Sequence, residues 1–300
     1  MVQSVSRIDK LHKTFLSEDV MKKSERAIIA ISIISFIIHL ILIFLADLGM
    51  LGNLGESELL SSPISAIYTP FSFILFFEVY LLVFYLPKSI TVYIGKQYEI
   101  ITLIVIRRLF KDLSQLELSN DWFEIKYDLQ FTYDIIAAIA LFFLIYIFNK
   151  LNKINEERRL PREDHDEKLT RFISLKKLLG SILVPVFIIM ALYSLGLWIF
   201  TSFFAPDHGI DNFRDVNKIF FDEFFTVLIL TDVLLLLLSL FQTSKFSKVF
   251  RNSGFIISTI LIRISFGTEG LINSILIVVA VLFGVLVLAI HNKFSKLEKN

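Results

Sequence analysis

Four charged side chains lie inside otherwise apolar stretches of the sequence, where a charge is costly unless a partner offsets it. Two are acids, Glu78 and Asp232, and two are arginines, Arg108 and Arg263. Counted from the near ends of the helices predicted below, at about 1.5 Å per residue, all four lie about 12 to 15 Å deep. The planar fork of an arginine suits a carboxylate. The spacing therefore predicts two buried pairs, Glu78 with Arg108 and Asp232 with Arg263.

Three further residues could add to this chemistry. Arg107 stands beside the first buried arginine and has no counterpart later in the chain, so we expect it either to reach Asp134 or to extend to the membrane surface. His39 lies in the middle of an apolar run. It is either a hydrogen-bonded interior residue or part of a proton relay.

Other kinds of site find little support in the sequence. There is no cysteine, and the five histidines are spread along the chain without a metal-ligand spacing such as HExxH. No Ser/His dyad or pair of catalytic aspartates is visible. We therefore expect no enzyme activity, no bound metal and no cofactor. The net charge of +1 carries no sign of nucleic-acid binding, and we expect no nucleic-acid partner.

The elements that must position these charges are long apolar helices. Hydrophobic residues make up 55% of the 300-residue chain, against about 45–50% in soluble domains. They gather in runs long enough to cross a bilayer, which indicates an all-α integral membrane protein. We expect eight transmembrane helices, at residues 26–48, 66–86, 98–116, 131–149, 178–204, 217–242, 254–267 and 271–291.

The distribution of basic residues supports this number of helices. With the N-terminus inside and eight crossings, the inside segments carry 23 of the 30 lysines and arginines, and the outside segments carry 4. Cytoplasmic loops are enriched in lysine and arginine. Both termini are therefore expected in the cytoplasm. The composition favours a bacterial inner membrane.

The polar residues also indicate an internal repeat. Glu78 and Asp232 are 154 positions apart, and Arg108 and Arg263 are 155 apart. Each repeat would hold four crossings, so the two copies would have the same orientation in the membrane. The predicted organisation is an N-terminal cytoplasmic segment that is amphipathic or a charged tail, a first four-helix unit, a charged cytoplasmic linker and a second four-helix unit, at residues 1–25, 26–150, 151–175 and 176–300.

One segment resembles a known family. The stretch from residue 71 to residue 106, which includes "FFEVYLLVFYLPKSITVYIGKQYEIITLIVI", is similar to the second and third helices of voltage-sensor domains in cation channels. The residues that carry the resemblance are Phe76, Phe77, Glu78, Leu81, Leu82, Pro87, Lys88 and Glu99. The resemblance implies a four-helix unit that responds to or conducts cations, with Glu78 and Glu99 as its acids. The predicted fourth helix, 131–149, lacks the arginines found in that family.

Two functions remain open from the sequence. The first is membrane transport or ion-linked sensing of protons or small cations, because buried ionisable groups in membranes are functional candidates by default. The second is a non-conducting membrane scaffold or partner-binding subunit, in which the charge pairs are structural braces. The expected partners are the lipid bilayer and, for the second function, another copy of the chain or a cytoplasmic protein.

Overall fold

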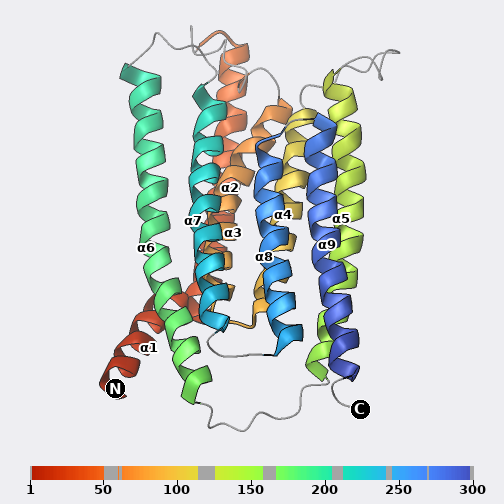
Figure 1. Ribbon diagram of the computed structural model, residues 1–300. Helices are drawn as coiled ribbons and strands as arrows, with labels where there is room; N and C mark the ends of the chain where they lie inside the picture. Colours follow the sequence, from red (N-terminus) through yellow and green to blue (C-terminus); the bar gives the residue numbers. More distant parts are fainter. Residues whose placement is uncertain are drawn as a thin grey trace. The chain divides into compact units, whose positions relative to one another are not determined.

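The computed structural model describes residues 2–50, 60, 63–113, 126–157, 167–204, 212–240, 245–268 and 270–297, and within these ranges it contains helices and turns but no strand (Figure 1). The helices, in chain order, are α1 (Val2–Leu16), α2 (Glu18–Asp47), the short 3-10 helix η3 (Pro63–Ile67), α3 (Tyr68–Tyr85), α4 (Ile90–Leu113), α5 (Lys126–Glu157), α6 (Glu167–Phe204), α7 (Asn212–Leu240), α8 (Phe246–Phe266) and α9 (Gly270–Leu297).

Several of these helices could cross a membrane. Among the described residues, five stretches are long and apolar enough: Asp9–Asp47, Leu129–Lys153, Thr170–Tyr193, Phe246–Phe266 and Gly270–Leu297. The helical fold and the multi-pass, membrane-embedded character that the sequence predicts are therefore supported. The number of eight crossings and the cytoplasmic location of both termini stay predictions.

Large apolar side chains cover the outer surfaces of these helices. On α5, Ile139 and Phe142 are 68% and 74% exposed, and on α2, Ile34 and Phe44 are 56% and 63% exposed. Soluble proteins rarely expose contiguous apolar surface of this kind. In a bilayer the same faces contact lipid, while the backbone polar groups are satisfied within each helix.

The helices extend beyond the apolar runs that predict them. The run at 98–116 belongs to α4, which begins at Ile90 after Ser89, whose hydroxyl oxygen accepts a hydrogen bond from the backbone N–H of Val92 at 3.3 Å. A serine at this position caps a helix N-terminus. Hydropathy marks only the apolar part of a helix, because lysine, glutamate and glutamine continue it at little cost.

The two predicted polar segments are largely helical. Within 1–25, α1 ends at Leu16 and α2 begins at Glu18, with Ser17 as the N-cap that accepts from the backbone N–H of Val20. Within 151–175, the described residues continue α5 to Glu157 and begin α6 at Glu167. The middle of that linker, 158–166, lies outside the described residues.

The chain divides into two compact units, neither of which is a continuous half. Unit 1 consists of Met1–Phe84, Phe110–Leu116 and Leu178–Thr226, and unit 2 of Tyr85–Leu109, Glu117–Lys177 and Val227–Asn300. This division differs from the two tandem units, 26–150 and 176–300, that the internal repeat predicts. The internal repeat itself stays a prediction.

Unit 2 is built around α9, which packs against both α8 and α5 (Figure 1). Its core contains aromatic residues in direct contact: the Phe148 ring lies 5.1 Å from the Tyr98 ring and 5.8 Å from the Phe255 ring, between centroids. Gly254 lets α8 approach α9 closely, because a Cβ atom at Gly254 would lie 2.8 Å from the methyl groups of Val287.

Within unit 1, polar contacts join α3 to α1 and to α2. The Tyr80 hydroxyl donates to the backbone carbonyl of Phe15 at 2.8 Å and so ties α3 to the end of α1. His39 of α2 is buried and its Nδ1 atom shares a hydrogen bond with the Thr69 hydroxyl. Of the two alternatives for His39, the structure supports the hydrogen-bonded interior residue.

Candidate functional site

The candidate site is a set of buried polar side chains inside unit 2, arranged at three levels along α4, α8 and α9. The first level surrounds Arg108, the second surrounds Tyr98, with Asp232 at the same depth, and the third surrounds Arg251. Buried polar groups are costly without hydrogen bonds. The hydrogen-bond partners at each level therefore indicate which groups only stabilise the fold and which could also bind an ion.

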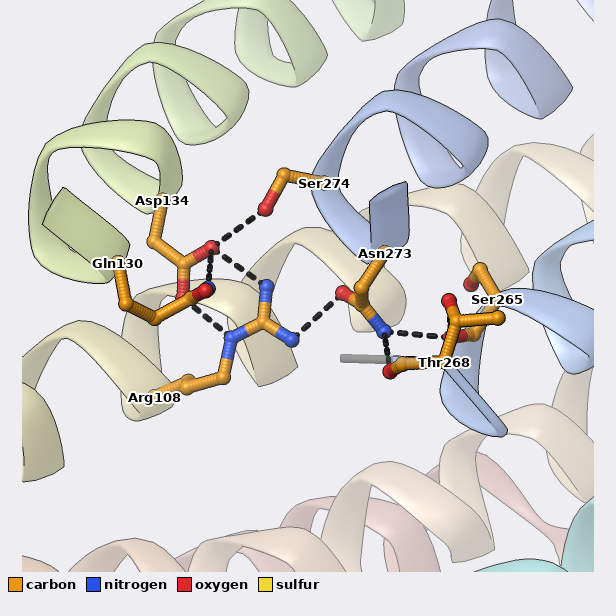
Figure 2. A network of polar contacts seen from close by, with 7 residues as sticks. All are labelled: Arg108, Gln130, Asp134, Ser265, Thr268, Asn273 and Ser274. Atoms are coloured by element: carbon orange, nitrogen blue, oxygen red, sulfur yellow. Dashed lines mark hydrogen bonds and ion pairs between the residues drawn. The ribbon is translucent and has the colours of Figure 1, made fainter. Parts of the chain in front are cut away.

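The first level is an arginine-carboxylate network (Figure 2). Arg108 donates through Nε and Nη2 to the two carboxylate oxygens of Asp134, the second at 2.6 Å, and through Nη1 to the Asn273 side-chain oxygen at 2.6 Å. Asp134 is fully buried. Its Oδ1 atom also accepts from Gln130 at 2.9 Å and from Ser274 at 2.7 Å. Every charged group in this network is thus well satisfied.

The same network reaches the turn before α9. The Asn273 amide donates to the backbone carbonyls of Ser265 at 2.5 Å and Thr268 at 3.2 Å (Figure 2). Asn273 therefore joins the guanidinium group to the end of α8. Bidentate arginine-carboxylate geometry of this kind fixes orientation as well as adding stability.

This geometry corrects the predicted partners of the two arginines. The carboxylate bound by Arg108 is Asp134, which was one of the two alternatives expected for Arg107, and the predicted pairing of Arg108 with Glu78 is not among the described contacts. The reason is the true start of α4: Arg108 lies 18 residues, about 27 Å, beyond Ile90. Glu78 lies only seven residues, about 10 Å, before the end of α3. Both Glu78 and Arg107 are buried.

The second level is a short chain of hydroxyl groups. The hydroxyls of Tyr98 and Ser258 lie 2.8 Å apart, and Ser258 donates to the backbone carbonyl of Ala280 at 2.6 Å. Because the Ser258 proton is used on that carbonyl, the Tyr98 hydroxyl is the donor in the first bond. Gly284 makes room for this arrangement, since a Cβ atom there would lie 1.8 Å from the Tyr98 hydroxyl oxygen.

Asp232 lies at the depth of the second level, because Gln97, which donates to it, is the neighbour of Tyr98 on α4. It is only 3% exposed, and its Oδ2 atom accepts from the Gln97 side chain at 2.9 Å. Its Oδ1 atom accepts no hydrogen bond from the described part of the chain. The buried hydroxyl of Tyr93 lies close enough to act on this carboxylate, but it is not in hydrogen-bonding geometry with any described residue.

The cation whose charge acts on Asp232 is Lys176, not Arg263. Lys176 is buried, and its ammonium group donates to the backbone carbonyl of Lys88 at 2.8 Å. The predicted pairing with Arg263 fails because α8 begins at Phe246, so Arg263 lies 17 residues, about 25 Å, from its start. Asp232 lies about 12 Å from the end of α7.

The third level joins Arg251 to His291. Arg251 donates through Nε and Nη2 to the Asn252 side-chain oxygen, at 3.2 and 2.9 Å, and through Nη1 to His291 Nε2 at 3.2 Å. The Nδ1 atom of His291 lies 3.0 Å from the Ser247 carbonyl. Since arginine only donates and a carbonyl only accepts, His291 is neutral with its proton on Nδ1.

Glu99, the acid that the resemblance places in the third helix, lies at the surface of unit 2. It forms an ion pair with Lys96 at 2.5 Å, with both side chains about one-third exposed, and accepts from Asn149 at 3.4 Å. An exposed pair of this kind contributes little to stability. Glu99 is therefore not part of the buried levels.

Sequence reasoning missed most of the partners because they are neutral. Gln97, Tyr93, Asn273 and Ser274 carry no charge, and a search for acids and arginines passes over them. One signal was available: α9 is apolar except for polar residues near its two ends, at Asn273 and Ser274 and again at His291 and Asn292. These are buried in the structure.

Comparison with known proteins adds no functional assignment. No family model matches the chain, and no curated protein or solved structure matches it either.

Proposed function

We propose that this chain carries protons or small cations across a membrane, through the interior of unit 2. The observation that carries the proposal is the series of buried polar groups at three levels within otherwise apolar helices. On α4 these run from Tyr93 to Arg108, a distance of 15 residues or about 22 Å. On α9 they run from Asn273 to His291, about 27 Å.

The length of this series matters because the hydrocarbon core of a bilayer is about 30 Å thick. A single buried pair is enough to brace two helices. When polar groups are buried repeatedly along most of a membrane-spanning helix, each level costs free energy. Intramembrane polar groups that face a helix-bundle interior commonly mark ion or proton pathways. The repeated levels thus favour a pathway over a simple brace.

The alternative is a non-conducting membrane scaffold or partner-binding subunit. One observation favours it: at the first level, Arg108 and Asp134 satisfy each other and their neighbours completely, as expected of a structural brace. A network of this kind rigidifies a core and specifies one arrangement of helices. It has no group left over to bind an ion.

The two functions are distinguished by flux measurements on purified protein in liposomes. An imposed potential should drive proton or monovalent-cation uptake above the rate of protein-free liposomes. Ser258→Ala, which removes the hydroxyl at the middle level, should lower the flux by about tenfold, the usual scale for one lost positioned group. The matched control is Ser35→Ala, since the bond that the Ser35 hydroxyl forms within the described residues is to the Ser32 carbonyl of its own helix.

Either of two results would reject transport in favour of the scaffold. The first is a flux equal to that of protein-free liposomes for protons and for every monovalent cation tried. The second is a flux that Ser258→Ala and Ser35→Ala leave equally unchanged, with both variants folded. In that case the search for function moves to the charged segments between the helices.

A further inference from the structure

The two buried aspartates of unit 2 differ sharply in their surroundings. Asp134 has both oxygens occupied by donors from three helices. Asp232 is almost as deeply buried, but Gln97 donates to only one of its oxygens. Its other oxygen, Oδ1, meets no donor within the described residues. A buried charge in this condition is expensive to maintain.

The groups that act on Asp232 come from two elements, α4 and α6. Tyr93 and Gln97 lie one helical turn apart on α4, and Lys176 lies near the start of α6. Tyr93 and Lys176 are the titratable groups that act on the carboxylate. The ammonium group of Lys176 is held by a backbone carbonyl. When charged, Lys176 favours the carboxylate form of Asp232, while the carboxylate oxygen Oδ1 has no donor among the described residues.

We propose that Asp232 is the site where the transported ion binds, that this ion is a proton, and that it adds at Oδ1. The inference rests on the proposed transport function and names its substrate. A proton added at Oδ1 forms a neutral carboxylic acid whose new O–H group can donate to the nearby Tyr93 hydroxyl. Release of the proton restores the carboxylate opposite the Lys176 charge. No electron is transferred and no other bond changes.

A metal cation suits this site less well. Small hard cations in proteins take about six or more oxygen ligands. Among the described residues, the oxygens here without a hydrogen bond are Asp232 Oδ1 and the Tyr93 hydroxyl, and a positive charge on Lys176 repels a cation. No group of three or more potential metal ligands occurs among the described residues. A proton needs one free oxygen, which the site provides.

The test is infrared difference spectroscopy of the protein in liposomes, recorded between about pH 5 and 9. A protonated carboxyl group has a C=O stretching band that a carboxylate lacks. We expect a band that grows as the pH falls and disappears in Asp232→Asn. Glu78→Gln is the matched control, because Glu78 is the other buried acid at the corresponding place in the predicted repeat. It should leave this band unchanged.

A second variant gives a readout that does not depend on removing the carboxyl group. Lys176→Met takes away the positive charge that favours the carboxylate. The band should then persist to a higher pH, by about one unit or more if the charge of Lys176 acts as a close partner of the carboxylate. An unchanged midpoint would reject the assigned role of Lys176. Absence of the band at every pH, or its persistence in Asp232→Asn, would overturn the proton site.

Proton flux measured on the same liposomes separates the two proposals. If the Asp232 band is present but no flux occurs, the proton site stands and transport is rejected. If flux occurs but Asp232→Asn changes neither the flux nor the spectrum, transport stands and Asp232 is rejected as its site. Loss of both band and flux in Asp232→Asn, with both retained in Glu78→Gln, supports the two proposals together.

Discussion

Replacing Asp134 by asparagine tests the best-defined contact in the structure. The carboxylate accepts two bonds from Arg108, one from Gln130 and one from Ser274. Asparagine has the same shape as aspartate, but only one of its two terminal side-chain atoms is an acceptor oxygen. The other is an amide NH₂ group, which would face N–H or O–H donors that now bond to a carboxylate oxygen. Breaking a buried ion pair from one side costs about 3–5 kcal/mol. The Arg108 side chain is 27% exposed, so we expect the lower end, about 3 kcal/mol.

The measurement is reversible unfolding of the purified protein in mixed detergent micelles, extended to a double-mutant cycle. Arg108→Met should cost a similar amount, because it leaves the Asp134 charge buried without its cation. The double variant should cost less than the sum of the two by about 2 kcal/mol or more. An ordinary interhelical hydrogen bond in a membrane is worth only about 0.6 kcal/mol. A coupling energy at or below that value would refute our account of the network.

Two further predictions follow from the second and third levels. Gly284→Ala should destabilise unit 2 by about 1–3 kcal/mol through overpacking against Tyr98, since the added Cβ would lie 1.8 Å from its hydroxyl oxygen. Tyr98→Phe in the same chain should restore part of this loss, while Gly267→Ala, where the nearest atom lies at 3.4 Å, should be nearly neutral in thermal unfolding. His291→Gln should keep most of the stability in thermal unfolding, because an amide can both accept from Arg251 and donate to the Ser247 carbonyl. His291→Phe should cost about 1–3 kcal/mol, because Arg251 loses that acceptor; equal stability of the two variants would contradict the assigned hydrogen bonds.

The helices were the predictable part of this fold, and their limits were not. Long apolar runs identify helices because a membrane-spanning segment must satisfy its backbone internally. Their ends depend on capping serines such as Ser17 and Ser89 and on polar residues that continue the helix. Adding eight residues to the start of α4 and eight to the start of α8 moved the depth of both buried arginines. The predicted partners changed as a consequence.

The candidate site was predictable in its charged residues but not in their contacts. Arg108, Asp134 and Asp232 stood out because charges are rare in apolar runs. The choice between Arg107 and Arg108 as the partner of Asp134 depends on helix rotation, since neighbouring residues point about 100° apart. That rotation is set by packing against α5 and α9, and such long-range packing is invisible in a single sequence.

The Arg108 fork also has a consequence for how the chain is made. Its carboxylate partner lies 26 residues later in the sequence, but its amide partner, Asn273, lies 165 residues later. At about 5–20 residues per second of synthesis, the first contact can form within about 1–5 seconds and the second only after about 8–33 seconds. If synthesis stops before α9, the chain lacks Asn273. The Nη1 group of Arg108 then lacks the acceptor that it has in the complete chain. The arginine in this way makes assembly of unit 2 depend on completion of its last helix.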